Sequence, residues 1–249
     1  AGALPQSQSG EPGPADPGHV STPSSLPDLI AVTGLAFEAR IAAGAGVRVV
    51  CAGNGGKLRG ALRDALSARC SGIISFGLAG GLDPDLKCGH WIVAESIIGE
   101  AGRFETDRRW TGALMQRLAN ATPAKIASSD APLIDPVAKR ALQQRSGAAA
   151  VDMESYIAAD IAQACGVPFA ACRVIIDAAD RTLPPAALAA QRSDGSINIA
   201  RVAKGVLLAP SQVPAMLRLA LDARVARASL ARGRRLLGAS LGFPDFSLL

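Results

Sequence analysis

The sequence predicts an α/β fold of three layers (αβα), in which helices cover both faces of a mostly parallel, twisted central mixed sheet. Two observations support this prediction. Apolar segments of strand length alternate with helical segments through short connections, and the apolar segments are hydrophobic throughout rather than at every second residue. Strands of that kind are buried on both faces, which is typical of parallel sheets between helix layers. The 249 residues, 49% of them hydrophobic, supply enough material for such a core.

The individual elements follow from periodicity and from the residues that end them. Leucines recur every four residues in 57–69 and predict a helix after a glycine-rich turn. Isoleucines four apart predict a second helix at 154–165, which Gly166 ends. We expect strands at 29–33, 47–51, 72–76, 91–94, 125–128 and 170–177.

The expected organisation is one domain at 28–241 between two terminal segments. Residues 1–27 are rich in Pro, Gly and Ser with few bulky apolar side chains, so we expect this segment to be disordered. A basic helix at about 212–238 is expected to close the domain, and 242–249 forms a tail.

The composition also indicates the cellular compartment of the protein and whether it carries disulfides or a metal site. No uninterrupted apolar run reaches the length of about 18 residues that a spanning helix needs. The N-terminal segment lacks the basic start and apolar middle of a secretory signal. The five cysteines form no C-x-x-C pair, and there are only two histidines. We therefore expect a cytoplasmic protein with reduced thiols and no metal site.

Three carboxylates are predicted to gather at one edge of the sheet. Asp177 ends the strand 170–177, and Asp152 and Glu154 lie at the start of the preceding helix. Open α/β sheets bind ligands at the carboxyl ends of their strands, so this grouping favours acid–base chemistry in an enzyme. Asp152 and Glu154 also fit the alternative of a helix N-cap and a first-turn acid. Asp177 is harder to explain structurally, because a buried acid is costly unless it is paired or protonated.

Two glycine-rich segments follow predicted strands. Gly53, Asn54, Gly55 and Gly56 precede a helix and could present backbone N–H groups to an anion or a polarised water. The segment GLAGG at 77–81 allows the backbone to approach a ligand closely. For both segments, a plain tight turn is the structural alternative.

Four segments together resemble the nucleoside phosphorylase/nucleosidase superfamily and follow its order from about residue 28 to residue 180. They are TGLAFE at 33–38, GNGG at 53–56, GLAGGL at 77–82, and VDME at 151–154 with RVIID at 173–177. Within the superfamily, the chain looks most similar to the methylthioadenosine/S-adenosylhomocysteine nucleosidases. Finer details, RTLPPAAL at 181–188 and the Arg-rich GRRLL at 233–237, resemble the hopanoid-associated branch.

The resemblance implies cleavage of the N-glycosidic bond of an adenine nucleoside, with adenosylhopane of hopanoid biosynthesis as the substrate implied by the finer branch. Asp177 matches the general acid that protonates the departing adenine at N7, a task that suits a buried acid with a raised pKa. Glu154 matches the carboxylate that binds the ribose 2′- and 3′-hydroxyls. Glu38 matches the residue that orients the attacking water.

The same resemblance implies further substrate-binding residues and a partner. Met153 would pack under the ribose, and a segment near the purine matches Ser129, Asp130, Pro132 and Leu133. Other implied contacts come from Asp152, Gly77, Leu78, Ala79, Gly80 and Arg173. Related nucleosidases are dimers, so the resemblance implies a homodimer, and it implies no cofactor.

Two positions depart from the family pattern. Ile176 stands where the nucleosidases carry a Ser that hydrogen-bonds the catalytic acid, and Leu78 replaces the Ser of their Gly-Ser-Ala-Gly-Gly segment. Both changes make the pocket more apolar, as a nucleoside linked to a hydrocarbon would favour. They also leave open the alternative of a nucleoside-binding protein with impaired catalysis.

Hydrolysis is favoured over phosphorolysis because Glu38 places a negative charge near the nucleophile. A carboxylate repels phosphate but can activate water, whereas a phosphorylase uses several Arg side chains or backbone donors to bind phosphate. Phosphorolysis to adenine and a ribose 1-phosphate product stays an alternative, since four basic side chains could still reach a phosphate: Arg40, Lys57, Arg59 and Arg103.

The basic character of the chain is concentrated at its C-terminal end. From residue 201 onward there are eight Lys or Arg residues and two Asp residues, in a chain of net charge +5. One interpretation is a basic amphipathic helix that lies on the anionic inner membrane. The alternative is a terminal helix packed on the sheet with solvated Arg side chains. No aromatic platform or motif supports nucleic-acid binding.

Overall fold

The computed structural model of the chain describes residues 2, 28–52, 55–66, 69–185, 196 and 198–244. Apart from Gly2, the segment 1–27, for which the sequence predicts disorder, lies outside the described residues. The same holds for Gly53 and Asn54 of the first glycine-rich segment and for residues 186–188 of the RTLPPAAL segment.

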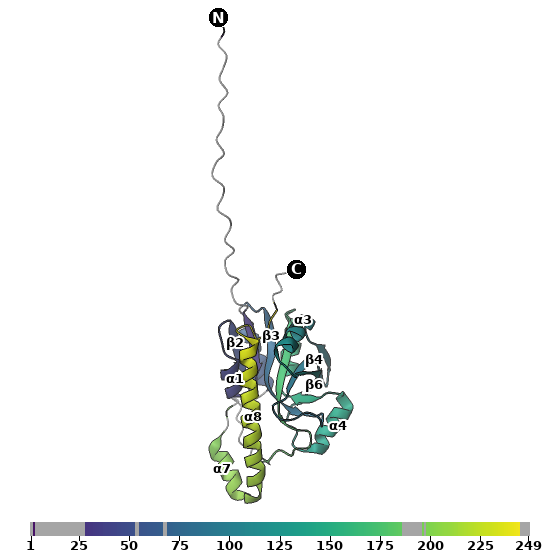
Figure 1. The fold of residues 1–249 in the computed structure, drawn as a ribbon, viewed down its shortest axis with the longest axis vertical. Coiled ribbons are helices and arrows are strands. Elements are labelled where there is room, and N and C mark those ends of the chain that lie inside the picture. Colours follow the sequence, from purple (N-terminus) through teal and green to yellow (C-terminus); the bar gives the residue numbers. More distant parts are fainter. Residues whose placement is uncertain are drawn as a thin grey trace.

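The strands are arranged in one eight-stranded mixed sheet (Figure 1). All six predicted strands are present, and four of them are longer than predicted: one by a single residue, and three because they continue through glycine-containing or polar residues. The two shortest strands, β5 and β7, were not predicted. The strands are β1 (Leu29–Thr33), β2 (Val47–Cys51), β3 (Gly72–Gly81), β4 (Trp91–Gly99), β5 (Gly102–Glu105), β6 (Thr122–Ser128), β7 (Ala150–Asp152) and β8 (Phe169–Asp177).

The pairing of the strands confirms a mostly parallel sheet. Pairs β1–β2, β1–β3, β3–β8, β4–β6 and β6–β7 are parallel, and β3–β7, β4–β5 and β4–β8 are antiparallel. Strand β8 pairs with both β3 and β4, which are also linked through β7 and β6, so these five strands form a closed ring of pairings. In the register, Gly80 of β3 is the partner of both Asp177 of β8 and Val151 of β7. The closure therefore brings two of the predicted site segments to one end of β3.

The helices form a layer on each side of the sheet, with the long α8 lying lengthwise on one face (Figure 1). Helices α2 and α5 correspond to the two helices predicted at 57–69 and 154–165, with shifted ends. The helices are α1 (Ala36–Ala42), α2 (Gly55–Ala65), α3 (Arg108–Arg117), α4 (Pro136–Ser146), α5 (Ser155–Ala164), α7 (Ile199–Leu208) and α8 (Val213–Leu237), with a 3₁₀ turn at Pro210–Gln212.

Two hydrophobic cores, one on each face of the sheet, explain why the strands are apolar throughout. Successive side chains of a strand point to opposite faces. In β1, Ile30 and Val32 belong to the core shared with α2 and α5, whereas Leu29 and Ala31 belong to the core shared with α1, α3 and α8. Every position of β1 is therefore buried.

Helix α4 lies at the edge of the molecule beside β6 (Figure 1) and was not predicted. It begins after Asp135, whose side chain accepts a hydrogen bond from the backbone N–H of Ala138, and Pro136 occupies its first turn. Gly147 ends it in the left-handed conformation, with φ of 62°. The first turn of this helix carries Lys139, which lines the cavity described below.

Candidate active site

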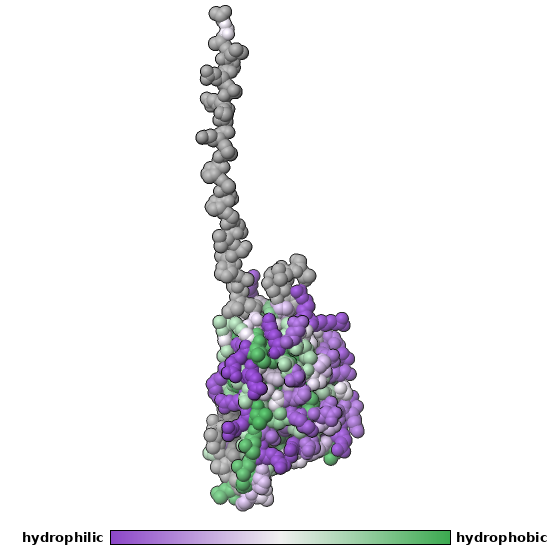
Figure 2. All heavy atoms as spheres, in the orientation of Figure 1, coloured by the Kyte–Doolittle hydropathy of each residue, from purple (hydrophilic) through white to green (hydrophobic). Residues whose placement is uncertain are grey.

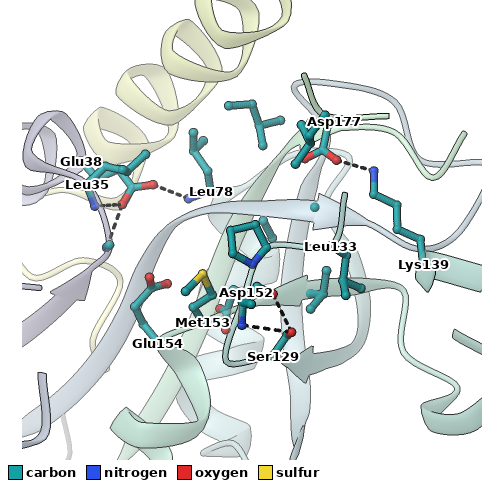
Figure 3. Close-up of a pocket in the computed structure, with 18 residues that line it drawn as sticks. Leu35, Glu38, Leu78, Ser129, Leu133, Lys139, Asp152, Met153, Glu154 and Asp177 are labelled. Atoms are coloured by element: carbon teal, nitrogen blue, oxygen red, sulfur yellow. Dashed lines mark hydrogen bonds and ion pairs between the residues drawn. The ribbon is translucent and has the colours of Figure 1, made fainter. Parts of the chain in front are cut away.

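A cavity of about 180 Å³ lies at the carboxyl ends of β3, β7 and β8 (Figure 3). Its wall is mainly apolar, with a small number of polar and charged groups, which is typical of small-molecule sites. The cavity is lined by Gly34, Leu35, Glu38, Leu78, Ala79, Gly80, Ser129, Ala131, Pro132, Leu133, Lys139, Val151, Asp152, Met153, Glu154, Ile176, Asp177 and Leu183.

Glu38 is held by backbone N–H groups on one side of this cavity. The side chain turns back from α1, and its Oε2 accepts hydrogen bonds from the amides of Gly34 and Leu35 at 2.9 and 2.8 Å. Its Oε1 accepts one from the amide of Leu78 at 2.8 Å, although the two residues are 40 positions apart. The residue is buried, and burial raises the pKa of Glu38 in spite of the opposing effects of Arg173 and these amides.

Arg173 is the buried cation that connects several site residues from behind the cavity. Its Nε lies 2.7 Å from Oδ2 of Asp152, and its Nη2 lies 3.1 Å from Oε2 of Glu154. Nη2 also donates to Ser75 Oγ at 2.5 Å. Arg173 is fully buried and is not part of the cavity wall. The resemblance implied a substrate contact for it, whereas in the structure it contacts the carboxylates that line the cavity.

The close packing of this network depends on the absence of side chains at two glycines. A Cβ on Gly77 would lie 2.7 Å from Nη1 of Arg173 and 2.8 Å from Cδ of Glu38. A Cβ on Gly34 would lie 2.3 Å from Oε1 of Glu154. Gly77 is thus a packing position next to the network and does not line the cavity.

Asp152 lies in the cavity wall and also bonds to the first residue of α5, although the N-cap of that helix is Glu154 rather than Asp152. Its Oδ1 accepts a hydrogen bond from the backbone amide of Ser155 at 3.1 Å, and its Oδ2 accepts one from the hydroxyl of the same residue. Asp152 therefore fixes Ser155, the first residue of α5, and also pairs with Arg173.

Glu154 directs its carboxylate into the cavity from the turn before α5 (Figure 3). Burial raises the pKa of Glu154 to about 7, with Arg173 acting in the opposite direction and the negative charges of Asp152 and Glu38 adding to the rise. A carboxylate that is buried and held by one arginine can accept hydrogen bonds from ligand hydroxyls.

Asp177 lies on the other side of the cavity from Glu38 and Glu154 (Figure 3), at the end of β8. Its Oδ2 forms a buried ion pair with Nζ of Lys139. Burial raises the pKa of Asp177, and Lys139 opposes that rise. Lys139 belongs to none of the motifs that the sequence shows, and its approach to Asp177 depends on where α4 packs.

The remaining candidate residues divide into those inside and those outside the cavity wall. Leu78, Ala79, Gly80, Met153, Ser129, Pro132 and Leu133 line the cavity together with the acids. Asp130 is exposed and is not in the wall. Gly55 and Gly56 start α2 and do not line it either, while Gly53 and Asn54 lie outside the described residues.

Comparisons with solved structures give the same fold. Futalosine hydrolase of Helicobacter pylori strain 26695 is 16% identical with a TM-score of 0.61, covering 87% of this chain and 97% of that chain. A Helicobacter pylori 5′-methylthioadenosine/S-adenosylhomocysteine nucleosidase, solved with butyl-thio-DADMe-Immucillin-A, is 16% identical with a TM-score of 0.60, covering 88% and 99%. The nucleosidase from Colwellia psychrerythraea 34H, in complex with adenine, is 17% identical with a TM-score of 0.56, covering 73% and 95%.

These structures confirm the predicted fold class, and at such identities they concern the fold alone. No curated protein matches the sequence. The family profile of the Phosphorylase superfamily, however, matches residues 31–208, which is more than half of the chain. With its mixed sheet and its cavity at the strand ends, the chain belongs to the Phosphorylase superfamily.

Proposed function

We propose that the protein cleaves the N-glycosidic bond of an adenine nucleoside by acid-assisted hydrolysis. The observation that carries this proposal is the meeting of three buried acids, Glu38, Glu154 and Asp177, in one largely apolar cavity. They come from segments far apart in the sequence, and burial raises the pKa of each. Buried acids with shifted pKa values in one cavity are typical of sites that transfer protons.

Each acid has a role that fits its surroundings. Asp177 in its protonated form donates to N7 of the purine, so that adenine leaves as a neutral base. Glu154, on the opposite side, accepts hydrogen bonds from the ribose hydroxyls and favours positive charge on the sugar as the bond breaks. Glu38 orients the attacking water, because a carboxylate that accepts three N–H bonds keeps a further lone-pair site.

The basic residues of the structure support water rather than phosphate as the nucleophile. Among the described residues that line the cavity, Lys139 is the only basic one, and it is paired with Asp177. Arg59 and Arg103 form ion pairs elsewhere, with Asp160 and Glu105. Arg40 and Lys57 are exposed and outside the wall.

Product analysis with and without phosphate tests the proposed reaction. We expect the protein to release adenine from 5′-methylthioadenosine or a bulkier 5′-substituted adenosine at the same rate in both buffers, with free sugar rather than a sugar 1-phosphate as the second product. Adenine and sugar are quantified by chromatography and mass spectrometry. Release that depends on phosphate would instead support phosphorolysis, and tight binding without any release would support the impaired nucleoside-binding protein.

For the 5′ substituent we propose a hydrocarbon, as in adenosylhopane. The support comes from the apolar side chains of the wall, among them Leu35, Leu78, Leu133, Ile176 and Leu183. Apolar surface of this kind favours an apolar group by roughly 25 cal/mol per Å² removed from water. In the product assay, adenosylhopane is therefore expected to have a higher kcat/KM than 5′-methylthioadenosine.

We also propose that the protein contacts an anionic membrane through the N-terminal half of α8. Leu217, Leu221 and Val225 recur every four residues on this helix and are 63%, 61% and 52% exposed. Figure 2 shows apolar residues along the lower part of α8, which is its N-terminal half. Leu207 and Leu208 of α7 are exposed as well. Within the described part of the chain, no helix is long and apolar enough to cross a bilayer.

The Arg-rich C-terminal half of α8 packs on the protein, which matches the alternative considered for it. Leu230, Gly233 and Leu237 are buried there, and Arg234 donates to the carbonyl of Ala42 at 3.0 Å. We therefore place the proposed contact on the N-terminal half, where Arg218 and Arg224 are exposed and suit anionic lipids; Arg201 and Lys204 of α7 are exposed as well. A second cavity, lined by Ala215, Arg218 and Leu219 of α8, shares Asp177 and Leu183 with the first.

Vesicle co-sedimentation tests the membrane contact. We expect binding to vesicles with an anionic lipid fraction and a loss of at least tenfold in L217S/L221S, because two apolar anchors are removed. The matched control is Val137→Ser, which changes an even more exposed apolar residue, on α4. Unchanged vesicle binding by the double variant would contradict the membrane contact. If the wild-type protein is a dimer in light scattering and the double variant is a monomer, the apolar residues form an interface between copies of the chain, which would also contradict the membrane contact.

A further inference from the structure

Lys139 is a charged side chain in an unusual place. It lies in the first turn of α4, and only 1% of its surface is exposed. Lysines are almost never fully buried without a partner, because removing an ammonium group from water is costly. A buried lysine in the wall of the candidate active site therefore requires compensating contacts.

The ammonium group has three N–H donors, and the structure supplies three acceptors. Nζ pairs with Oδ2 of Asp177 and donates to the backbone carbonyls of Ala178 and Arg181 at 2.9 and 3.1 Å. A charged amine uses all three donors in this arrangement. One side chain thus joins the carboxyl group of Asp177 to the backbone of the segment that follows it.

That segment also forms part of the cavity wall. Arg181 donates its backbone N–H to Ala178 at 3.0 Å, and Leu183 donates to the carbonyl of Ile134 at 2.8 Å, just before α4. The side chain of Leu183 lines the cavity. Residues 178–183 are therefore held against the start of α4 by the contacts of Lys139 and by the backbone bond of Leu183.

No other described side chain donates a hydrogen bond to Asp177. The preceding residue, Ile176, lines the cavity with an apolar side chain, and Leu183 does the same. Without Lys139, the carboxyl group of Asp177 could rotate about its own side-chain bonds. A loss of position of about 1 Å can lower a reaction rate about 100-fold.

We propose that Lys139 is the positioning residue of the general acid. It holds the carboxyl group of Asp177 in the cavity wall and ties it to residues 178–183, so that the acid and the wall around the ligand form one rigid unit. This inference rests on the proposed function, because it assigns Asp177 the proton transfer.

Several charged groups surround Asp177, and among them Lys139 lowers the pKa of Asp177 most strongly. Asp222 of α8 adds to the rise of the Asp177 pKa, whereas Lys139 lowers it. Other charged groups line the adjoining second cavity: Asp180, Arg181 and Arg218. Removing the charge of Lys139 is expected to raise the pKa of Asp177 further, so the protonated acid persists to higher pH.

The test compares Lys139→Met and Lys139→Gln with the wild-type protein and with Arg140→Met, which removes the neighbouring exposed cation of α4. Lys139→Gln keeps a donor and is included in case the Met variant is poorly folded. We expect kcat/KM for adenine release to fall by at least tenfold in both Lys139 variants, and the alkaline limb of the pH profile to move to higher pH. A merely structural role would lower activity without moving that limb. Lys139→Arg keeps the positive charge and is expected to return the alkaline limb of the pH profile to its wild-type position.

Hydrogen exchange separates this inference from the proposed function. Amides of 178–183 are expected to exchange at least tenfold faster in the Lys139 variants than in Arg140→Met, whether or not the protein cleaves nucleosides. If the wild-type protein releases no adenine, the proposed function fails, and the exchange rates alone decide whether Lys139 holds the segment. Wild-type exchange in 178–183, or a wild-type pH profile in Lys139→Met and Lys139→Gln, would overturn the inference.

Discussion

Replacing Asp177 by Asn is expected to lower the rate of adenine release by about 100- to 10,000-fold, the range that one general acid contributes. An amide cannot donate the proton that makes adenine a neutral leaving group. The acid form is needed, and burial raises the pKa of Asp177. Activity of the wild-type protein should therefore fall as the pH rises through that pKa, and this limb should be absent from the variant.

The matched control for this variant is Asp180→Asn, the same chemical change on the exposed side of the same turn. Asp177→Asn also leaves the buried Lys139 without a charged partner, so thermal unfolding is measured in parallel and activity is assayed well below the midpoint. Binding of the nucleoside, followed by calorimetry, should persist. Turnover within threefold of the wild-type rate in a folded variant would show that Asp177 is not the general acid.

Replacing Glu154 by Gln is expected to reduce kcat/KM by about 10- to 100-fold, the equivalent of losing one or two hydrogen bonds to a charged group. The working form is the carboxylate, and burial raises its pKa to about 7. The wild-type kcat/KM should therefore decrease as the pH falls through about 7, since protonation removes the charge that holds the sugar hydroxyls. Gln does not titrate, so this acid limb should disappear in the variant.

Glu100→Gln, an exposed glutamate in the turn between β4 and β5, is the control for that experiment. The structure also predicts a difference between substrates. A 2′,3′-dideoxy analogue lacks the hydroxyls that Glu154 is proposed to bind, so Glu154→Gln should have little further effect on it. An acid limb that survives unchanged in Glu154→Gln would show that another group titrates there.

The parts of the fold that could be predicted from sequence are those whose burial produces a hydrophobic pattern in consecutive residues. Burial on both faces makes β1 apolar at four of its five positions, and Leu29 and Ile30 belong to different cores. Strands β5 and β7 have only four and three residues and were missed, because such short segments have no period to detect. The closed ring of pairings through β8 was not predicted either, since it is set by pairings between distant strands.

The candidate site was partly predictable for a similar reason. The resemblance named the acids that line the cavity, since each lies in a motif whose order is visible in the chain. Lys139 was missed, although Asp135 followed by Pro136 signals the start of a helix and could have located α4. Its contact with Asp177, 38 residues away, depends on how α4 packs on the rest of the domain. For Asp130 the position in a motif suggested a ligand contact, whereas in the structure the residue is exposed and lies outside the cavity wall.

The central claim, proton donation by Asp177 to the departing purine, is tested most directly by the nucleobase itself. A 5′-substituted adenosine and its 7-deaza analogue differ only at N7, which is a carbon in the analogue and cannot accept the proton. We expect the wild-type protein to release adenine from the first compound and no measurable 7-deazaadenine from the second, while both compounds bind. Release of the two bases at similar rates would contradict it.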